Sequence, residues 1–168
     1  NVSYVPNDYL NFQIGNGNQF IGNGYRSMLL SDFTVNYPFA KVETNFWKNR
    51  IQYNIIYALH QNLYRLMAFN TPEATYEKNI GTYHYLDFAI TENIQIGLFE
   101  GNLWKRVDSL GSHEPDYLFL NPVIFINTAA KGFQQEGFIG IAGINASFRF
   151  GKQQLYGQAV LSNAKPGA

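Results

Sequence analysis

The sequence predicts an all-β chain, either an antiparallel transmembrane β-barrel or a fragment of a larger one, with short turns on one side and long loops on the other. Three observations favour this fold class. Long segments alternate between apolar and polar residues, aromatic residues make up 17% of the chain, and charged residues make up only 14%. No apolar stripe at helical spacing is sustained along the chain.

The clearest strand runs over residues 50–60. Its even positions begin with the polar residues Arg50, Gln52 and Asn54, whereas its odd positions are apolar or aromatic. The length of 11 residues exceeds the five or six of a typical soluble strand and matches the roughly 9–11 residues of a strand that crosses a bilayer. The face that we expect to touch lipid consists of Ile51, Tyr53, Ile55, Tyr57 and Leu59.

Three hairpins are expected, joined by longer and more polar connections. The hairpins pair residues 39–44 with 51–60, 83–90 with 94–99, and 138–150 with 155–161, and the connections cover residues 61–81, 101–117 and 128–136. Strict alternation of strand direction then puts the turn at Gly151 on the side of the long loops, so this prediction has one strand too few or too many. We expect roughly eight or nine strands in a single β-barrel segment over residues 1–168, as part of a longer protein.

Composition excludes several classes of function. Lys plus Arg and Asp plus Glu both number 12, so the net charge is zero and nucleic acid is not an expected partner. Cysteine is absent, which excludes disulfides, Cys-ligated zinc and thiol chemistry. The glycine-rich residues 15–24 lack the Gly-Lys-Ser/Thr of a phosphate-binding loop. We expect no metal, no cofactor and no catalytic residue.

Charged groups within the predicted strands are expected to face a polar barrel lumen, because a charge that faces lipid costs about 2–4 kcal/mol near mid-bilayer. A glycosidase would use two of the carboxylates Glu43, Asp87 and Glu100, but the sequence does not fix their separation. The expected lumen network consists of Arg26, Asp32, Glu43, Arg50, His84 and Glu100.

Trp104 is the best candidate for stacking on a sugar ring, because it stands among polar and basic residues at the start of a long loop. Most other Trp and Tyr residues are expected to pack or to form interfacial girdles. The predicted glycan-binding residues are Asn102, Trp104, Lys105 and Arg106.

One segment resembles a known family. Residues 20–32, Phe-Ile-Gly-Asn-Gly-Tyr-Arg-Ser-Met-Leu-Leu-Ser-Asp, are similar to the F-I-G-x-G-Y-R-S-L-L-L-S-D stretch of the capsule-assembly (Wzi-like) outer-membrane proteins, close to their RemB-like branch from gliding bacteria. Shorter similarities follow in the same order at residues 36–38, 83–86, 97–100, 121–125 and 155–158.

This resemblance implies a non-enzymatic β-barrel in the bacterial outer membrane that takes part in capsule assembly, polysaccharide attachment or gliding motility. Its expected partners are the lipid bilayer, surface polysaccharide and other envelope proteins. Two alternatives stay open, namely a structural subunit of a larger secretion or motility complex of the cell envelope, and a soluble β-sandwich module that binds carbohydrate.

Overall fold

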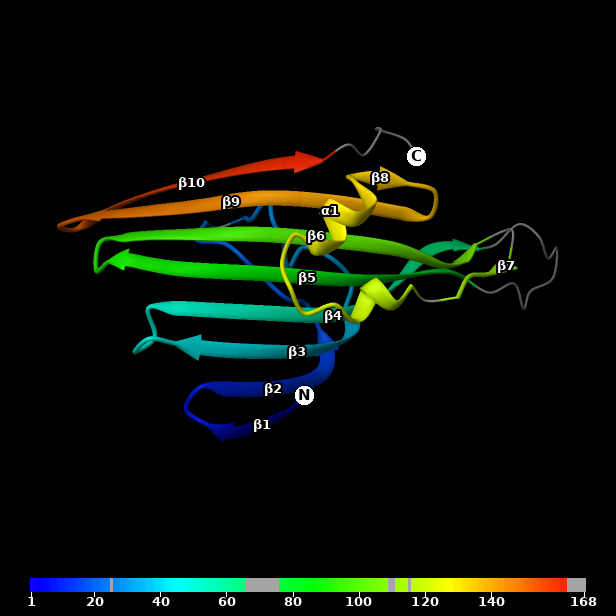
Figure 1. Ribbon diagram of the computed structural model, residues 1–168, viewed down its shortest axis with the longest axis horizontal. Helices are drawn as coiled ribbons and strands as arrows, with labels where there is room; N and C mark the ends of the chain where they lie inside the picture. The colour runs from blue at the N-terminus through cyan, green and yellow to red at the C-terminus, as the bar shows by residue number, and fades with distance from the viewer. Residues whose placement is uncertain (25, 66–75, 109–110, 115, 163–168) are drawn as a thin grey trace.

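The computed structural model describes residues 1–24, 26–65, 76–108, 111–114 and 116–162. These residues form one large β-sheet with very little helix (Figure 1), as the alternating pattern predicts. In chain order the elements are β1 (Val2–Asn7), β2 (Leu10–Gly17), β3 (Tyr37–Phe46), β4 (Ile51–Arg65), β5 (Tyr76–Thr91), β6 (Ile94–Asp108), β7 (Gly111–Ser112), the 3-10 helix η1 (Tyr117–Leu120), α1 (Ile126–Lys131), β8 (Gln134–Gln135), β9 (Phe138–Phe150) and β10 (Gln153–Ser162).

The sheet is an antiparallel meander, in which successive strands lie side by side. Its order is β1-β2-β3-β4-β5-β6-β9-β10, and the short strands β7 and β8 pair with β6 and β9. The expected all-β antiparallel fold is therefore confirmed. Over the described ranges, β1 and β10 each pair on one side only, so the sheet is not closed into a barrel.

Short turns and long connections lie at opposite ends of the sheet, as the sequence predicts. The turns after β1, β3, β5 and β9 share one end, and the connections after β2, β4 and β6 share the other. The predicted connection over residues 61–81 is shorter than expected, because β4 continues to Arg65 and β5 begins at Tyr76. Its remaining residues, 66–75, lie outside the described part of the chain.

The sequence prediction has one strand too many, and the extra strand falls between β6 and β9. The predicted connections over 101–117 and 128–136 leave residues 118–127 between them, and a strand there would reverse the chain once more. The structure instead forms η1 and α1 in this region, and β6 pairs directly with β9. With no crossing strand in this segment, the turn at Gly151 falls on the side of the other short turns.

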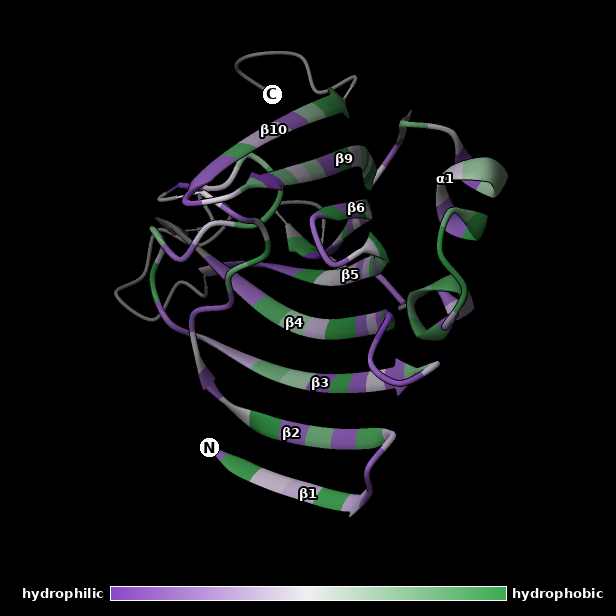
Figure 2. Cartoon of the chain, turned by 90° about the vertical axis from the view of Figure 1, so that its left-hand side faces the viewer, coloured by the Kyte–Doolittle hydropathy of each residue, from purple (hydrophilic) through white to green (hydrophobic). Residues whose placement is uncertain are grey.

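Two irregular segments cover opposite faces of the sheet (Figures 1 and 2). Residues 18–24 and 26–36, between β2 and β3, lie on the face that we call the back face. Residues 116–133, which contain η1 and α1, lie on the front face, the one that Figure 1 shows, with α1 in front of β6 and β9.

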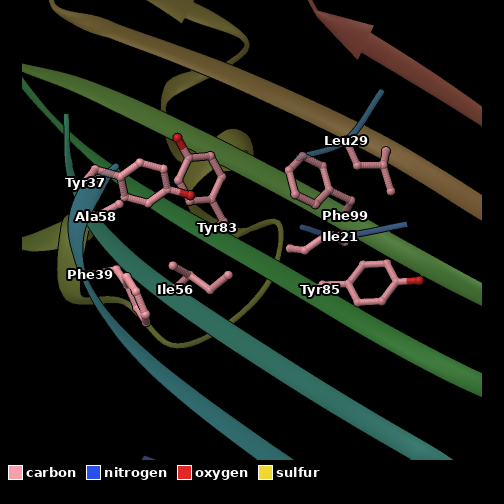
Figure 3. Packing of buried hydrophobic residues seen from close by; sticks show 9 residues of the cluster. All are labelled: Ile21, Leu29, Tyr37, Phe39, Ile56, Ala58, Tyr83, Tyr85 and Phe99. Carbon is pink, nitrogen blue, oxygen red and sulfur yellow. The ribbon is translucent and has the colours of Figure 1, made fainter. Parts of the chain in front are cut away.

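The larger hydrophobic core lies on the back face, where residues 18–24 and 26–36 pack onto the sheet (Figure 3). Ile21 and Leu29 of this segment pack with Phe99 of β6, which is fully buried. Leu29 approaches β9 closely because position 143 is glycine: a Cβ there would lie 2.5 Å from Leu29 Cδ2. The other members of the cluster are Tyr37, Phe39, Ile56, Ala58, Tyr83 and Tyr85. Burial of a large apolar side chain in this cluster, Ile, Leu or Phe, stabilises the fold by about 1.5–3 kcal/mol.

A smaller core on the front face holds η1 against the sheet. Ile80, Trp104 and Phe138, from β5, β6 and β9, are buried together, and Leu118 and Phe119 of η1 pack against them. The two irregular segments are therefore both parts of the folded domain rather than loose connections.

Candidate functional site

The front face of the sheet is apolar from the short turns to the middle of the strands. Register pairs Tyr53 with Leu86 and Leu98 with Ile144, so the apolar positions of neighbouring strands share one face. Up to the level of Glu100, the described strands place no other charged residue on it. We call the apolar side chains of the front face the apolar band. Its large residues that are at least 40% exposed are Val2, Tyr4, Phe12, Ile14, Phe46, Leu59, Ile144, Phe150, Leu155 and Leu161.

On β5 and β6, four polar side chains in the middle of the front face are withdrawn from solvent. Thr82, His84, Glu100 and Asn102 are each 0% exposed. Register makes His84 the direct neighbour of Glu100 and Thr82 the direct neighbour of Asn102 across β5 and β6. We call these four residues the polar row; residues 116–133 cover it.

Glu100 binds the first turn of α1. Its Oε2 accepts a hydrogen bond from the Phe125 amide (2.5 Å), and its Oε1 accepts bonds from the Thr128 amide (2.9 Å) and the Thr128 hydroxyl (2.6 Å). Phe125, at the N-cap, makes no side-chain cap bond of its own. Glu100 therefore serves as a long-range cap: it accepts from N–H groups at the start of α1 that have no partner within the helix.

Tyr53 and Thr82 fasten the segment in front of α1. The Tyr53 hydroxyl lies 2.5 Å from the Pro122 carbonyl oxygen and 2.7 Å from His84 Nδ1. Because a hydroxyl has one proton, which goes to the carbonyl, we assign the second bond to donation from His84 Nδ1–H. The Thr82 hydroxyl donates to the Phe119 carbonyl at 2.8 Å.

The expectation that the whole odd face of β4 touches lipid is therefore wrong for three residues, because Ile55 is only 7% exposed and residues of the same chain cover Tyr53 and Tyr57. Tyr53 is tied to Pro122, and the Tyr57 ring packs against Phe119 with centroids 5.5 Å apart, while its hydroxyl donates to the Leu120 carbonyl at 3.3 Å. Residues of the same chain cover these rings. The alternating sequence pattern shows which residues of β4 share one face of the sheet. It does not show that another segment of the same chain covers that face.

The covering segment turns apolar side chains outward. Tyr117 is 85% exposed, Leu120 68%, Val123 49% and Ile126 44%. The segment thus seals the polar row beneath it and continues the apolar character of the front face on its own outer surface. An apolar outer surface of this kind differs from that of a helix on a soluble domain, whose outer face is polar.

An ion pair links the two helices of this segment. Lys131 at the end of α1 binds Asp116, which caps η1 by accepting a bond from the Leu118 amide at 3.0 Å. Burial alone would raise the pKa of Asp116, but the hydrogen bonds from Lys131 and Leu118 and the positive charge of Lys131 hold this pKa below its usual value.

The four predicted glycan-binding residues do not form one exposed surface. Asn102 belongs to the polar row, and the Trp104 ring is 5% exposed and packed between Phe119 and Phe138. In this conformation the indole offers no open face to a sugar. Lys105 lies on the wall of one cavity and Arg106 on the wall of another.

The six residues expected to share a lumen network lie in separate places. His84 and Glu100 are buried on the front face, whereas Glu43 lies on the back face, where it pairs with Lys41 at 2.6 Å. The other three, Arg26, Asp32 and Arg50, are exposed in irregular segments and a turn. The structure brings together only His84 and Glu100.

A cavity of about 590 Å³ opens at the end of the sheet that carries the long connections. Its charged lining residues are Lys78 and Arg106, and His60 adds an imidazole; no Asp or Glu is among the described residues that line it. We call it the loop-end cavity. Its charge favours an anionic ligand. Sequence reasoning found Arg106 but missed Lys78, because only the pairing of β4, β5 and β6 brings these residues together.

No helix in the described part of the chain is both long and apolar enough to span a bilayer. Comparison with known proteins gave no match among family models, among curated proteins or among solved structures.

Proposed function

We propose that this sheet is a wall of an outer-membrane β-barrel and that the protein helps to hold surface polysaccharide at the bacterial cell surface, by binding rather than by chemistry. The observation that carries the proposal is the apolar band. It spans the sheet from β1 to β10, and large side chains such as Ile14, Leu155 and Leu161 are 66–70% exposed on it. Contiguous exposed apolar surface of this kind is typical of membrane or protein contact sites.

Strand length supports a bilayer as the partner. Strands β4, β5 and β6 contain 15, 16 and 15 residues, more than the roughly 9–11 that a tilted strand needs to cross the hydrocarbon core. With the short turns on the inner side, the surplus length projects beyond the outer surface of the bilayer. This arrangement would carry the loop-end cavity to the cell exterior.

The segment over residues 116–133 supports the same orientation. A buried charge such as Glu100 would be costly next to lipid, but three hydrogen bonds satisfy it and α1 covers it. The outer side chains Leu120, Val123 and Ile126 would lie against acyl chains or at the headgroup boundary.

Two observations support polysaccharide as the ligand. Residues 20–32 resemble the Wzi-like capsule-assembly proteins, and the loop-end cavity carries Lys78, Arg106 and His60 without a lining carboxylate. An acidic polysaccharide would be drawn to this charge, and many weak contacts along one polymer would add up by avidity. The same attachment would serve either capsule retention or gliding motility.

A pair of charge substitutions tests the membrane proposal. Ile144→Lys puts an ammonium on the apolar band of β9, whereas Gln154→Lys puts one on the back face of β10, at a residue that is also exposed. The cost of about 2–4 kcal/mol for a lysine near mid-bilayer predicts at least a tenfold loss of folded protein from the outer-membrane fraction for Ile144→Lys. The matched Gln154→Lys variant should remain at the wild-type level. Equal membrane yields of the two variants, or a wild-type protein that is monodisperse in water without detergent, would refute the proposal and favour the soluble carbohydrate-binding module.

Co-sedimentation tests the ligand. Membrane vesicles that contain the protein should retain an acidic polysaccharide, and the double substitution Lys78→Gln, Arg106→Gln should reduce retention several-fold. Lys152→Gln, in the exposed β9–β10 turn, is the matched control. Retention that is unchanged in the double variant would reject the loop-end cavity. Purification of the wild-type protein in a stable multi-protein particle would instead favour the envelope-complex alternative.

A further inference from the structure

A second, smaller pocket lies on the back face of β3, β4 and β5, next to residues 20–23. Its volume is about 290 Å³. Register places Glu43 beside Asn54 and Gln52 beside Asp87, so these side chains converge on one area of the sheet. Its polar lining residues include Asn23, Lys41, Glu43, Asn54 and Asp87.

The carboxylates of this pocket are held in place by their neighbours. Glu43 pairs with Lys41 at 2.6 Å and accepts a hydrogen bond from Asn11 Nδ2 at 2.7 Å. Asp87 accepts a hydrogen bond from the side-chain amide of Gln95. The acceptor oxygens at the floor of the pocket are therefore oriented before any ligand arrives, which lowers the entropic cost of binding.

Asn54 lines the pocket with an amide oxygen, Oδ1, that makes no hydrogen bond to the described residues. The residue is only 9% exposed. The Nδ2 of Asn23, on the opposite wall, is also buried and without a partner in the described part of the chain. A buried polar group without a partner costs about 1–3 kcal/mol. A ligand group that accepts from Asn23 and donates to Asn54, once the two amides turn toward the pocket, would remove both costs.

We propose that this pocket binds a neutral polyhydroxylated ligand, one ring of a neutral saccharide. The wall offers acceptors on Asn54, Glu43 and Asp87 and donors on Asn23 and Lys41. A hydroxyl group both donates and accepts, so several hydroxyls on one ring match such a mixture. A divalent cation would meet the ammonium of Lys41, and a phosphate would meet two carboxylates.

Shape agrees with this ligand class. The volume lies just below the 300–1,000 Å³ range of drug-sized ligand sites, which suits one ring rather than a longer chain. Phe20, which is 39% exposed, supplies an aromatic wall on which the C–H face of a sugar can stack. The inference goes beyond the proposed function, because the pocket lies on the back face, away from both the apolar band and the loop-end cavity.

Titration of the purified full chain with glucose, galactose and N-acetylglucosamine, followed by saturation-transfer NMR, tests the inference. We expect weak binding of at least one sugar, with a Kd on the order of 1 mM. Asn54→Leu should weaken it at least tenfold without loss of folding, because the amide that it removes has an unpaired oxygen. Asn45→Leu, on the same face of β3 but not part of the pocket lining, is the matched control and should bind as the wild type does.

Three outcomes would overturn the inference: no binding of any of the three sugars, equal binding by Asn54→Leu and the wild type, or binding of Ca²⁺ or inorganic phosphate that depends on Asn54 in place of sugar. The membrane proposal fails on a different result, since Ile144→Lys leaves this pocket untouched. The two ideas can therefore be rejected separately.

Discussion

Replacement of Glu100 by glutamine tests how the front-face segment is held. The wild-type carboxylate accepts three hydrogen bonds, from the Phe125 amide and from the amide and hydroxyl of Thr128. Glutamine has almost the same shape, but one of its two terminal groups is an NH₂, which cannot accept. Whichever way the carboxamide turns, either the Phe125 amide or the Thr128 amide faces another donor, because the Thr128 hydroxyl can rotate and accept.

The expected cost follows from these bonds. One buried donor without an acceptor costs about 1–3 kcal/mol, and the remaining bonds weaken by about 1 kcal/mol because they lose the charged acceptor. The sum predicts that the attached state of α1 is destabilised by about 2–4 kcal/mol. At a factor of ten for each 1.4 kcal/mol, the opened state becomes about 30–700 times more populated.

Native-state hydrogen exchange measures this population directly, because the Thr128 amide exchanges when α1 detaches. We expect Glu100→Gln to accelerate exchange at Thr128 by this factor and to leave the amides of β3 unaffected. Glu92→Gln, in the exposed turn between β5 and β6, is the matched control and should change neither. Unchanged exchange at Thr128 in Glu100→Gln would refute the assignment of Glu100 as the cap of α1.

Three further predictions concern the same fold. NMR titration of Asp116 should give a pKa below the ordinary value of about 3.9. The stabilisation from its ion pair is therefore fully present above about pH 3.9 and is lost as the pH falls through the lowered pKa. A pKa at or above the ordinary value would contradict the pairing. Tyr53→Phe should lower the free energy of unfolding by about 1–2 kcal/mol, more than Tyr57→Phe does. The Tyr53 hydroxyl makes two close hydrogen bonds, whereas the Tyr57 hydroxyl makes one at 3.3 Å. Equal values for the two variants in denaturant unfolding would argue against the hydrogen bonds of Tyr53 to Pro122 and His84. Phe99→Ala should cost about 3–5 kcal/mol in the same assay, because the ring is fully buried, and a loss below about 1 kcal/mol would place it outside the core.

Local pattern was sufficient to predict much of the sheet. The β9–β10 hairpin follows from alternation over residues 138–150 and from Gly151, whose positive φ of 58° suits a tight turn. The turn between β3 and β4 was placed correctly although Trp47, Lys48 and Asn49 all adopt positive φ there, because the strands on either side carry the pattern. The β1–β2 hairpin was not predicted, although Leu10, Phe12 and Ile14 alternate with Asn11 and Gln13 in β2.

The contacts of the polar row could not be predicted from the residues that flank each of its members in the sequence. Glu100 and Thr128 are 28 positions apart, and nothing in either neighbourhood indicates that one caps a helix that begins near the other. The basic and polar neighbours of Trp104 suggested exposure, but Phe119 and Phe138 close over the ring from distant parts of the chain. Contacts of this kind depend on topology, which the period-two pattern does not encode.

Spin-label accessibility along β10 tests the central claim that the apolar band faces lipid. The chain has no cysteine, so single cysteines can be introduced one at a time over residues 153–161 and labelled without background. In membranes, labels at Leu155, Ala159 and Leu161 should collide mainly with oxygen, which dissolves in lipid, and labels at Gln154 and Tyr156 mainly with a water-soluble nickel reagent. This alternation with period two is the predicted result, and equal access of the nickel reagent to both sets of positions would contradict the account.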